Sequence, residues 1–254
     1  MSGRLEGKVT LVTGASTGIG RAAAFAIARA GSRVIVSAGS NVKGGEETAA
    51  AIREAGGEAT FVRADISKAA EVRLLIERTI ECYGRLDCAF NNAGVEVSKR
   101  GPTAECPEDE WDRVVDINLK GTWLCMKYEI PRMLEAGGGA IVNTSSTTGL
   151  RGYGNISPYV ASKHGIVGLT KAAAVEYGKL GVRVNCLCPG GVMTPQLERI
   201  LATGRRPSTG VLGRFGKPEE VADVVVFLLS SEAALMHGHA LPLDGGLTMM
   251  AANP

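Results

Sequence analysis

The chain has 254 residues, of which 45% are hydrophobic, and its formal net charge is +2. This length is close to the limit for one α/β core and no linker-like segment interrupts it, so we expect one domain over residues 1–254. A charge so near zero argues against nucleic acid and anionic membranes as partners. The chain has no apolar run long enough to span a bilayer, and its first eight residues lack the apolar core of a signal peptide. We therefore expect a cytoplasmic protein.

Apolar segments of strand length alternate along the chain with longer segments of helical periodicity. Strands are expected at Val9–Thr13, Arg33–Ser37, Ala59–Arg63, Leu86–Asn91, Ala140–Ser145, Arg183–Leu187 and Ala240–Leu243. Helices are expected at residues 18–30, 43–55, 68–83, 107–136, 157–179 and 217–230. The strand segments are continuously apolar, which is typical of strands covered on both faces. This alternation predicts an α/β fold with one doubly wound, parallel, seven-stranded sheet.

Two irregular stretches follow the ends of predicted strands, at residues 95–106 and 190–216. Ligands of open α/β sheets bind beyond the carboxyl ends of the strands, so we expect these stretches to border the ligand site. Each contains a pair of basic residues, Lys99-Arg100 in the first and Arg205-Arg206 in the second. Two charges are too few for a basic patch, and we interpret them as solvated loop residues.

A glycine-rich turn, Thr13 to Gly20, follows the first predicted strand and opens a helix. Glycines at such a turn let backbone N–H groups approach a pyrophosphate at the helix N-terminus. The spacing G-x-x-x-G-x-G is one residue longer than the commonest fingerprint, and such a turn can also do no more than join a strand to a helix. Its place in the first βαβ unit favours a dinucleotide site. The expected contacts from this turn are Gly14, Ser16, Thr17, Gly18, Ile19 and Gly20.

The end of the second strand bears on which dinucleotide is bound. NAD sites usually place an Asp or Glu there, whereas NADP sites avoid that charge and often add an arginine. The segment Ser37 to Asn41 contains neither. Ala38 and Ser40 are expected contacts of the cofactor there, and donors could come from Ser37, Ser40, Asn41 and the nearby Lys43. This favours NADP, with NAD still open.

The glycine-rich turn is one of several motifs that together resemble the short-chain dehydrogenase/reductase family. The others are Asn91-Asn92-Ala93-Gly94, Asn118, Ser146, Tyr159-x-x-x-Lys163 and Pro189-Gly190. The resemblance covers essentially the whole chain, and the combination of motifs is highly specific. It implies a Rossmann-like fold and an oxidoreductase that transfers a hydride between a nicotinamide dinucleotide and a ketone or alcohol.

The resemblance also implies cofactor contacts that spacing alone does not give. These are Asp65, Ile66, Asn91, Ala93, Gly94, Pro189, Gly190, Val192 and Thr194. The segment Asp244-Gly245-Gly246 resembles a tail that many tetrameric members pack across a subunit interface, which implies a homotetramer. One departure is Ala38-Gly39, which stands where the family usually has an acidic or basic residue.

Tyr159 and Lys163 are four residues apart on a predicted helix and therefore share one face. Reducing a ketone requires a proton on oxygen as well as the hydride that the cofactor supplies. A free tyrosine, with a pKa of about 10, exchanges protons poorly near neutral pH, and a neighbouring ammonium favours the phenolate. We therefore expect Tyr159 to be the general acid/base with a lowered pKa, and both residues to contact the cofactor.

Ser146 follows the fifth predicted strand, 13 residues before Tyr159, and its hydroxyl can donate to the substrate oxygen. Ser145 is the competing candidate, but strand alternation directs it to the opposite face. The resemblance assigns the role to Ser146 and implies that Asn118 anchors a water that relays protons from Lys163. Each residue alone has an ordinary structural explanation, and only their occurrence together supports catalysis.

Three functions remain open from the sequence. The first is a carbonyl reductase or secondary alcohol dehydrogenase for a small or medium-sized apolar ketone. Its expected pocket residues are Val95, Glu96, Thr147, Thr148, Tyr153, Gly191, Met193 and Leu197. The second is a 3-oxoacyl-carrier-protein reductase, which similar sequences often are, although Leu134-Glu135-Ala136 and Ala174-Val175-Glu176 offer no basic residues to an acidic carrier. The third is a non-catalytic dinucleotide-binding protein.

No metal site is expected. The three histidines are His164, His237 and His239. They have no carboxylate or cysteine nearby in the sequence to complete a set of ligands, so we interpret them as structural or interface residues.

Overall fold

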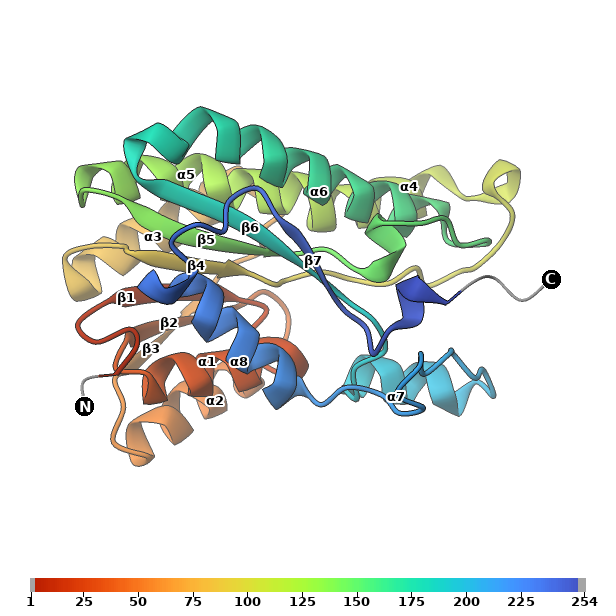
Figure 1. Ribbon diagram of the computed structural model, residues 1–254, viewed down its shortest axis with the longest axis horizontal. Helices are drawn as coiled ribbons and strands as arrows, with labels where there is room; N and C mark the ends of the chain where they lie inside the picture. The colour runs from red at the N-terminus through yellow and green to blue at the C-terminus, as the bar shows by residue number, and fades with distance from the viewer. Residues whose placement is uncertain (1–2, 251–254) are drawn as a thin grey trace.

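The computed structural model describes residues 3–250, and its strands form one parallel sheet in the order β3-β2-β1-β4-β5-β6-β7 (Figure 1). The strands are β1 (Val9–Thr13), β2 (Arg33–Ala38), β3 (Ala59–Arg63), β4 (Cys88–Asn91), β5 (Gly139–Thr144), β6 (Val182–Pro189) and β7 (Ala240–Leu243). The helices are α1 (Gly18–Arg29), α2 (Val42–Glu54), α3 (Ala69–Tyr83), α4 (Glu108–Val115), α5 (Gly121–Glu135), α6 (Ser157–Tyr177), α7 (Pro195–Ala202) and α8 (Pro218–Leu229). The predicted doubly wound parallel α/β sheet is confirmed.

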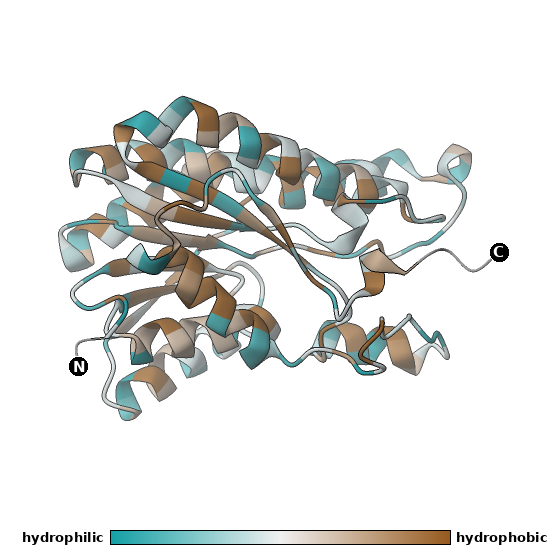
Figure 2. Ribbon diagram, viewed as in Figure 1, coloured by the Kyte–Doolittle hydropathy of each residue, from teal (hydrophilic) through white to brown (hydrophobic). Residues whose placement is uncertain are grey.

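Helices cover both faces of the sheet, which explains why its central strands are apolar without alternation. Helices α1, α2 and α8 lie on one face and α3, α5 and α6 on the other (Figure 1). All five residues of β1 are buried. The strands are accordingly among the most hydrophobic segments of the chain, whereas the helices combine apolar and polar residues (Figure 2).

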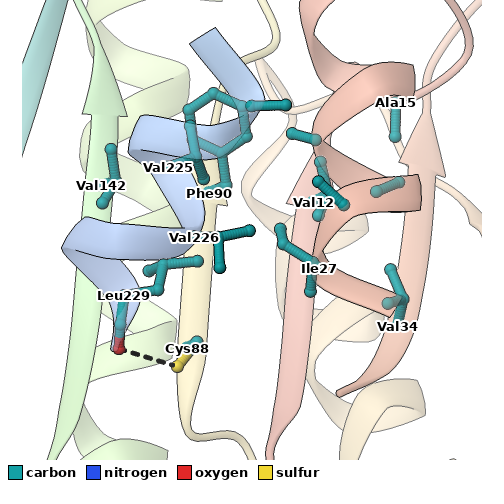
Figure 3. Close-up of a cluster of buried hydrophobic side chains, with 14 of the residues drawn as sticks. Val12, Ala15, Ile27, Val34, Cys88, Phe90, Val142, Val225, Val226 and Leu229 are labelled. Carbon is teal, nitrogen blue, oxygen red and sulfur yellow. Dashed lines mark hydrogen bonds between the residues drawn. The ribbon is translucent and has the colours of Figure 1, made fainter. Parts of the chain in front are cut away.

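Two hydrophobic clusters fill the space between the sheet and its helices. On the α1 and α8 side, Val12 and Phe90 pack with Ile27 and Val225, all of them buried (Figure 3). The opposite cluster includes neighbours across the sheet such as Leu11, Ile35, Ala89, Ile141 and Val184. Burying one large apolar side chain contributes about 1.5–3 kcal/mol. The central strands are thereby fixed, and so are the positions of the loops at their carboxyl ends.

The structure differs from the sequence prediction in two segments. The helix expected over residues 107–136 consists of α4, a π-helical turn at Asp116–Lys120 and then α5. Helix α7 occupies part of the stretch 190–216 that was expected to be irregular. Both differences lie beside the carboxyl edge of the sheet. None of the helices within residues 3–250 is long and apolar enough to cross a membrane.

The strand order reverses direction between β1 and β4. At this point the connections from the two strands leave toward opposite faces of the sheet, and a crevice opens between them. The loops after β1 and β4 therefore border the expected ligand site.

Candidate active site

The glycine-rich turn between β1 and α1 forms one wall of the crevice. Gly14 and Gly18 have φ angles of 65° and 55°, in the left-handed region that favours glycine. A Cβ on Gly14 would lie 2.7 Å from the Cα of Ala93, so glycine is needed there for the two loops to approach. The Asn92 amide donates to the carbonyls of Thr13 and Gly14 at 3.3 and 3.2 Å. These contacts hold the turn in a concave shape that suits a pyrophosphate.

A cavity of about 660 Å³ runs along this turn. Among the expected cofactor contacts, it is lined by Gly14, Ser16, Thr17, Gly18, Ile19, Ala38, Ser40, Asp65, Ile66, Ala93, Gly94 and Thr194. A second cavity of about 430 Å³ adjoins it and is lined by Tyr159, Lys163, Pro189, Gly190 and Val192. The two cavities share Gly94 and Thr194, so they form one continuous site.

Two expected cofactor contacts line neither cavity. Gly20 is buried in α1, where it packs against the carbonyl of Gly14. The Asn91 side chain points into the core and donates to Glu129 at 3.0 Å and to Asn143 at 3.1 Å. Gly20 and Asn91 therefore support the loops that carry the lining residues.

The dinucleotide cavity reaches the end of β2 and has features that fit a bound ribose. Ser37 lines this cavity, is 1% exposed, and its hydroxyl has no hydrogen-bond partner among the described residues. Such an unpaired buried hydroxyl is costly unless a ligand satisfies it. Arg63 also lines the cavity, because the pairing of β2 with β3 places it beside Ala38. Sequence reasoning missed Arg63, although the second and third strands were expected in one sheet.

Helix α6 carries the candidate catalytic pair. The Nζ of Lys163 lies 5.5 Å from the centroid of the Tyr159 ring and donates to the Thr144 carbonyl at 2.8 Å. The Ser146 hydroxyl, beyond the end of β5, lies close enough to the Tyr159 phenol to lower its pKa. Ser145 instead donates to the Lys163 carbonyl at 2.8 Å. The structure therefore brings Ser146, Tyr159 and Lys163 together in the second cavity.

Burial and neighbouring charges shift the pKa values of Tyr159 and Lys163. Burial raises the pKa of Tyr159 above its ordinary value and the negative charge of Glu96 raises it further, while the nearby Ser146 hydroxyl lowers it. Burial also lowers the pKa of Lys163 to about 8. The sequence predicted a lowered pKa for Tyr159, and the groups of the chain itself do not produce one. The reason is that the Lys163 ammonium faces the Thr144 carbonyl and burial dominates.

Asn118 lies in the π-helical turn and fixes the loop that follows β4. Its side chain is fully buried; Nδ2 donates to the Val95 carbonyl at 3.0 Å and Oδ1 accepts from the Val95 N–H at 2.8 Å. Nδ2 also donates to the Ser162 hydroxyl at 3.3 Å, which ties this loop to α6. The backbone carbonyl of Asn118 accepts from Thr122 at 2.7 Å. Asn118 thus connects the second cavity's wall to the helix that carries Tyr159.

The second cavity extends beyond Tyr159 as a candidate substrate pocket. Of the expected pocket residues, it is lined by Val95, Glu96, Thr147, Thr148, Tyr153, Gly191 and Leu197. Met193 is 39% exposed and does not line it. Three arginines and a glutamine that the sequence did not point to also line it, namely Arg100, Arg151, Arg205 and Gln196.

The paths of the irregular loops, which no local pattern predicts, decide where these four side chains lie. The available signal was the pair of basic dipeptides in the irregular stretches. All four residues of these dipeptides are exposed in loops, as the sequence predicts, and Arg100 and Arg205 also border the pocket.

Comparison with known proteins agrees with this geometry. A family model described as enoyl-(acyl carrier protein) reductase matches residues 14–248. The chain belongs to the short-chain dehydrogenase/reductase family. One relative in this family is the short chain dehydrogenase/reductase astE of Aspergillus oryzae, which is 40% identical over 97% of each chain.

Other short-chain dehydrogenase/reductase relatives have more specific names. Cyclohexanol dehydrogenase of Acinetobacter sp. is 41% identical over 248 residues, which are 98% of each chain. The crystal structure of levodione reductase superposes with a TM-score of 0.92 at 38% identity and covers 97% of this chain and 100% of that one. The protein is accordingly an oxidoreductase that acts on CH–OH or C=O groups.

Proposed function

We propose that this protein is a carbonyl reductase or secondary alcohol dehydrogenase that prefers NADP(H) and uses Tyr159 to exchange a proton with the substrate oxygen. The observation that carries the proposal is the meeting of Ser146, Tyr159 and Lys163 in a cavity continuous with the dinucleotide crevice. A structural role for a surface helix does not explain this arrangement, because Lys163 is only 4% exposed and its ammonium enters the cavity wall.

Each side chain has a distinct part in the reaction. The dinucleotide supplies or accepts the hydride when bound. Ser146 donates a hydrogen bond to the substrate oxygen and holds it beside the Tyr159 phenol. Tyr159 donates its proton to the ketone oxygen in reduction and takes a proton from the hydroxyl in oxidation. An oxidised nicotinamide in the crevice would add a positive charge beside the phenol and, together with Lys163, would favour the ionised form that the groups of the chain alone do not produce.

Asn118 completes the proposed proton path. Its hydrogen bonds to both backbone groups of Val95 keep the loop after β4 next to Lys163. A Cβ on Gly94 would lie 3.1 Å from the Asn118 Oδ1 and 3.6 Å from the Lys163 Nζ, so loop and ammonium are close neighbours. We propose that a water held by Asn118 passes protons between Lys163 and solvent.

The preference for NADP(H) rests on the end of β2. The segment from Ala38 to Asn41 has no carboxylate to repel a 2′-phosphate. Arg63 lies beside Ala38 in the sheet and lines the same cavity, although it also pairs with Glu71 at 3.6 Å. Arg63 nevertheless brings a cationic donor to the end of β2, where Ser37, Ser40 and Asn41 offer only hydroxyls and an amide.

The names of the relatives indicate the kind of carbonyl compound. Cyclohexanol dehydrogenase and levodione reductase are named for a cyclic alcohol and a dione. A pocket of about 430 Å³ beside Tyr159 has room for a molecule of that size. We therefore propose cyclohexanone as the first ketone to test.

One observation favours the carrier-protein alternative as a second candidate. Arg100, Arg151 and Arg205 line the pocket, and docking an acidic carrier requires basic residues there. Turnover of a 3-oxoacyl-carrier-protein in preference to a free ketone would bring this function forward.

A single assay tests the proposed activity. The purified protein is incubated with cyclohexanone and NADPH that carries deuterium at C4, first of one stereochemistry and then of the other. We expect the nicotinamide absorbance to fall and, with one of the two, deuterium to appear on the carbinol carbon. No change of absorbance with a broad panel of ketones, with either NADPH or NADH, would refute the proposal and favour a non-catalytic dinucleotide-binding protein.

The assembly of the protein is a further part of the proposal. Trp123 on α5 is 43% exposed and Val175 on α6 is 85% exposed, and both helices lie on the same face of the sheet. Exposed apolar side chains of this size are typical of surfaces that pack against another subunit. We propose a homotetramer in which this face is buried. The six cysteines are all unpaired, as in proteins of a reducing compartment, and we propose the cytoplasm.

A further inference from the structure

The pocket beside Tyr159 carries an excess of positive charge on its lining. Arg100 lies in the loop after β4, and Arg205 lies in the loop after α7. These loops are about a hundred residues apart in the sequence, yet both arginines line the same cavity. Glu96 is the one carboxylate on this lining, so the two arginines outnumber it.

Neither arginine is neutralised by a close ion pair. Within residues 3–250, no carboxylate lies within 4.0 Å of the guanidinium of Arg100 or Arg205. Burial lowers the pKa of Arg100, and the charge of Arg205 lowers it further, while Glu96 acts in the opposite direction. The two cations therefore repel each other across the pocket. An anion bound between them would remove this repulsion and accept charge-assisted hydrogen bonds from both.

The loop that carries Arg100 is fixed by hydrogen bonds with two residues of α4. Arg113 donates to the Glu96 carbonyl at 2.7 Å and pairs with Glu110 at 2.8 Å. Glu110 in turn accepts a hydrogen bond from the Ser98 N–H. Because the backbone at Glu96 and Ser98 is already fixed, a ligand that contacts Arg100 has to order the exposed arginine side chain but not the preceding loop. The backbone on this side of the pocket is thus preorganised.

Each of the two pocket arginines has a basic neighbour in the sequence that lies outside the pocket. Lys99 and Arg206 do not line the pocket, although each is adjacent in sequence to an arginine that does. Arg206 instead donates to the carbonyls of Leu201 and Arg205 at 3.3 and 3.0 Å. The chain therefore offers one matched control for each pocket arginine.

We infer that Arg100 and Arg205 form a subsite for a carboxylate on the substrate, so that the preferred substrates are ketones or secondary alcohols that carry a carboxylate group. This inference rests on the proposed function and replaces the apolar ketone expected from the sequence. A small carboxylate is favoured over an acidic carrier protein because the arginines line the same cavity of about 430 Å³ as Tyr159.

The inference is tested with two ketones of the same ring. The ratio of kcat/KM for 3-oxocyclohexanecarboxylate to that for cyclohexanone is measured for the protein and its variants. We expect the unaltered protein to prefer the carboxylated ketone and Arg100→Gln and Arg205→Gln each to reduce the ratio about tenfold or more, as for the loss of one hydrogen bond to a charged group. Lys99→Gln and Arg206→Gln should keep the ratio of the unaltered protein.

A binding measurement separates this inference from the proposed function. Cyclohexanecarboxylate has no carbonyl to reduce, and its affinity is measured by calorimetry in the presence of NADP. We expect Arg100→Gln and Arg205→Gln to weaken its binding about tenfold and the two control variants to leave it unchanged. Thermal melts of all four variants establish that they are folded.

Each outcome has a definite meaning. A ratio near one in the unaltered protein, or equal losses in pocket and control variants, would overturn the subsite. Turnover of a 3-oxoacyl-carrier-protein that falls in Arg100→Gln and Arg205→Gln, with no preference for the carboxylated ketone, would assign the arginines to carrier docking. Binding of cyclohexanecarboxylate without turnover of either ketone would overturn the proposed function and leave the subsite standing.

Discussion

The proposed preference for NADP rests on single residues at the end of β2. Ser40 lines the crevice there and is exposed, so its replacement leaves the packing intact. A carboxylate at this position would repel a 2′-phosphate and accept hydrogen bonds from a 2′-hydroxyl. We expect Ser40→Asp to weaken NADP binding about tenfold or more while NAD binding is kept or strengthened. Calorimetric titration of both dinucleotides measures this.

Ser40→Asn is the matched control, because it has nearly the same shape without the charge. It should change the affinity for NADP much less than Ser40→Asp does. If the aspartate variant weakened both dinucleotides equally, or neither, the ribose would lie elsewhere and the preference for NADP would lose its basis.

The sequence predicts some site residues and misses others for a physical reason. Helical spacing places Tyr159 and Lys163 on one face, and strand alternation separates Ser146 from Ser145, but the resemblance to the family is what assigns their roles. Arg63, Arg100 and Arg205 could not be predicted as site residues, since their positions depend on which strands are neighbours and how long loops run. Short-range periodicity carries no information about either.

At the level of elements, the π-helical turn at Asp116–Lys120 is the clearest departure from the predicted pattern. Apolar periodicity continues through residues 107–136, so the sequence shows no break. The extra residue in the turn places Asn118 where it contacts both the loop after β4 and α6. π-Helical turns are frequent at functional sites. Here the turn serves to position Asn118 for its contacts with the loop after β4 and with α6.

The missed helix α7 did have a signal in the sequence. Thr194 accepts a hydrogen bond from the Leu197 N–H at 3.3 Å, and Pro195 is the first helical residue. A threonine followed by proline is a common start for a helix. The irregular composition of residues 190–216 obscured it.

Helix α5 carries a buried acid whose titration affects the stability of the fold. Glu129 is 0% exposed; its Oε2 accepts from Asn91 at 3.0 Å, and Oε1 has no partner among the residues described. Burial raises its pKa from 4.5 to about 8. Below pH 4.5 both the folded and the unfolded chain hold the proton. As pH rises toward 8 only the unfolded chain releases it, so this group's contribution to stability is progressively lost.

Glu129→Gln should remove this pH dependence, because the amide keeps the shape of the protonated acid and does not titrate. We expect the melting temperature of the variant, relative to that of the unaltered protein, to rise by at least about 2 °C between about pH 5 and about pH 8. Glu135→Gln, at the exposed end of the same helix, serves as control and should show no such change. Parallel curves for all three proteins would mean that Glu129 is ionised at neutral pH in the fold.

For the whole molecule, alternation and strand burial predict a parallel, doubly wound sheet with its site at the carboxyl ends of the strands, while the order of the strands is known only from the structure. Continuous apolar segments predict strands covered on both faces, and the parallel order β3-β2-β1-β4-β5-β6-β7 confirms this. The reversal between β1 and β4 then places the crevice. The path of the loops over this edge gives the pocket its charge, and the sequence pattern does not determine that path.

The central claim is that the Tyr159 phenol transfers the proton beside the bound dinucleotide. It is tested most directly by comparing the turnover and the NADP affinity of Tyr159→Phe with those of Tyr177→Phe. Tyr177 lies on the same helix, about 27 Å away along its axis, and is outside both cavities. The account predicts that Tyr159→Phe lowers kcat about 10²–10⁴-fold with nearly unchanged NADP affinity, while Tyr177→Phe behaves as the unaltered protein. Turnover of Tyr159→Phe close to that of the unaltered protein would contradict it.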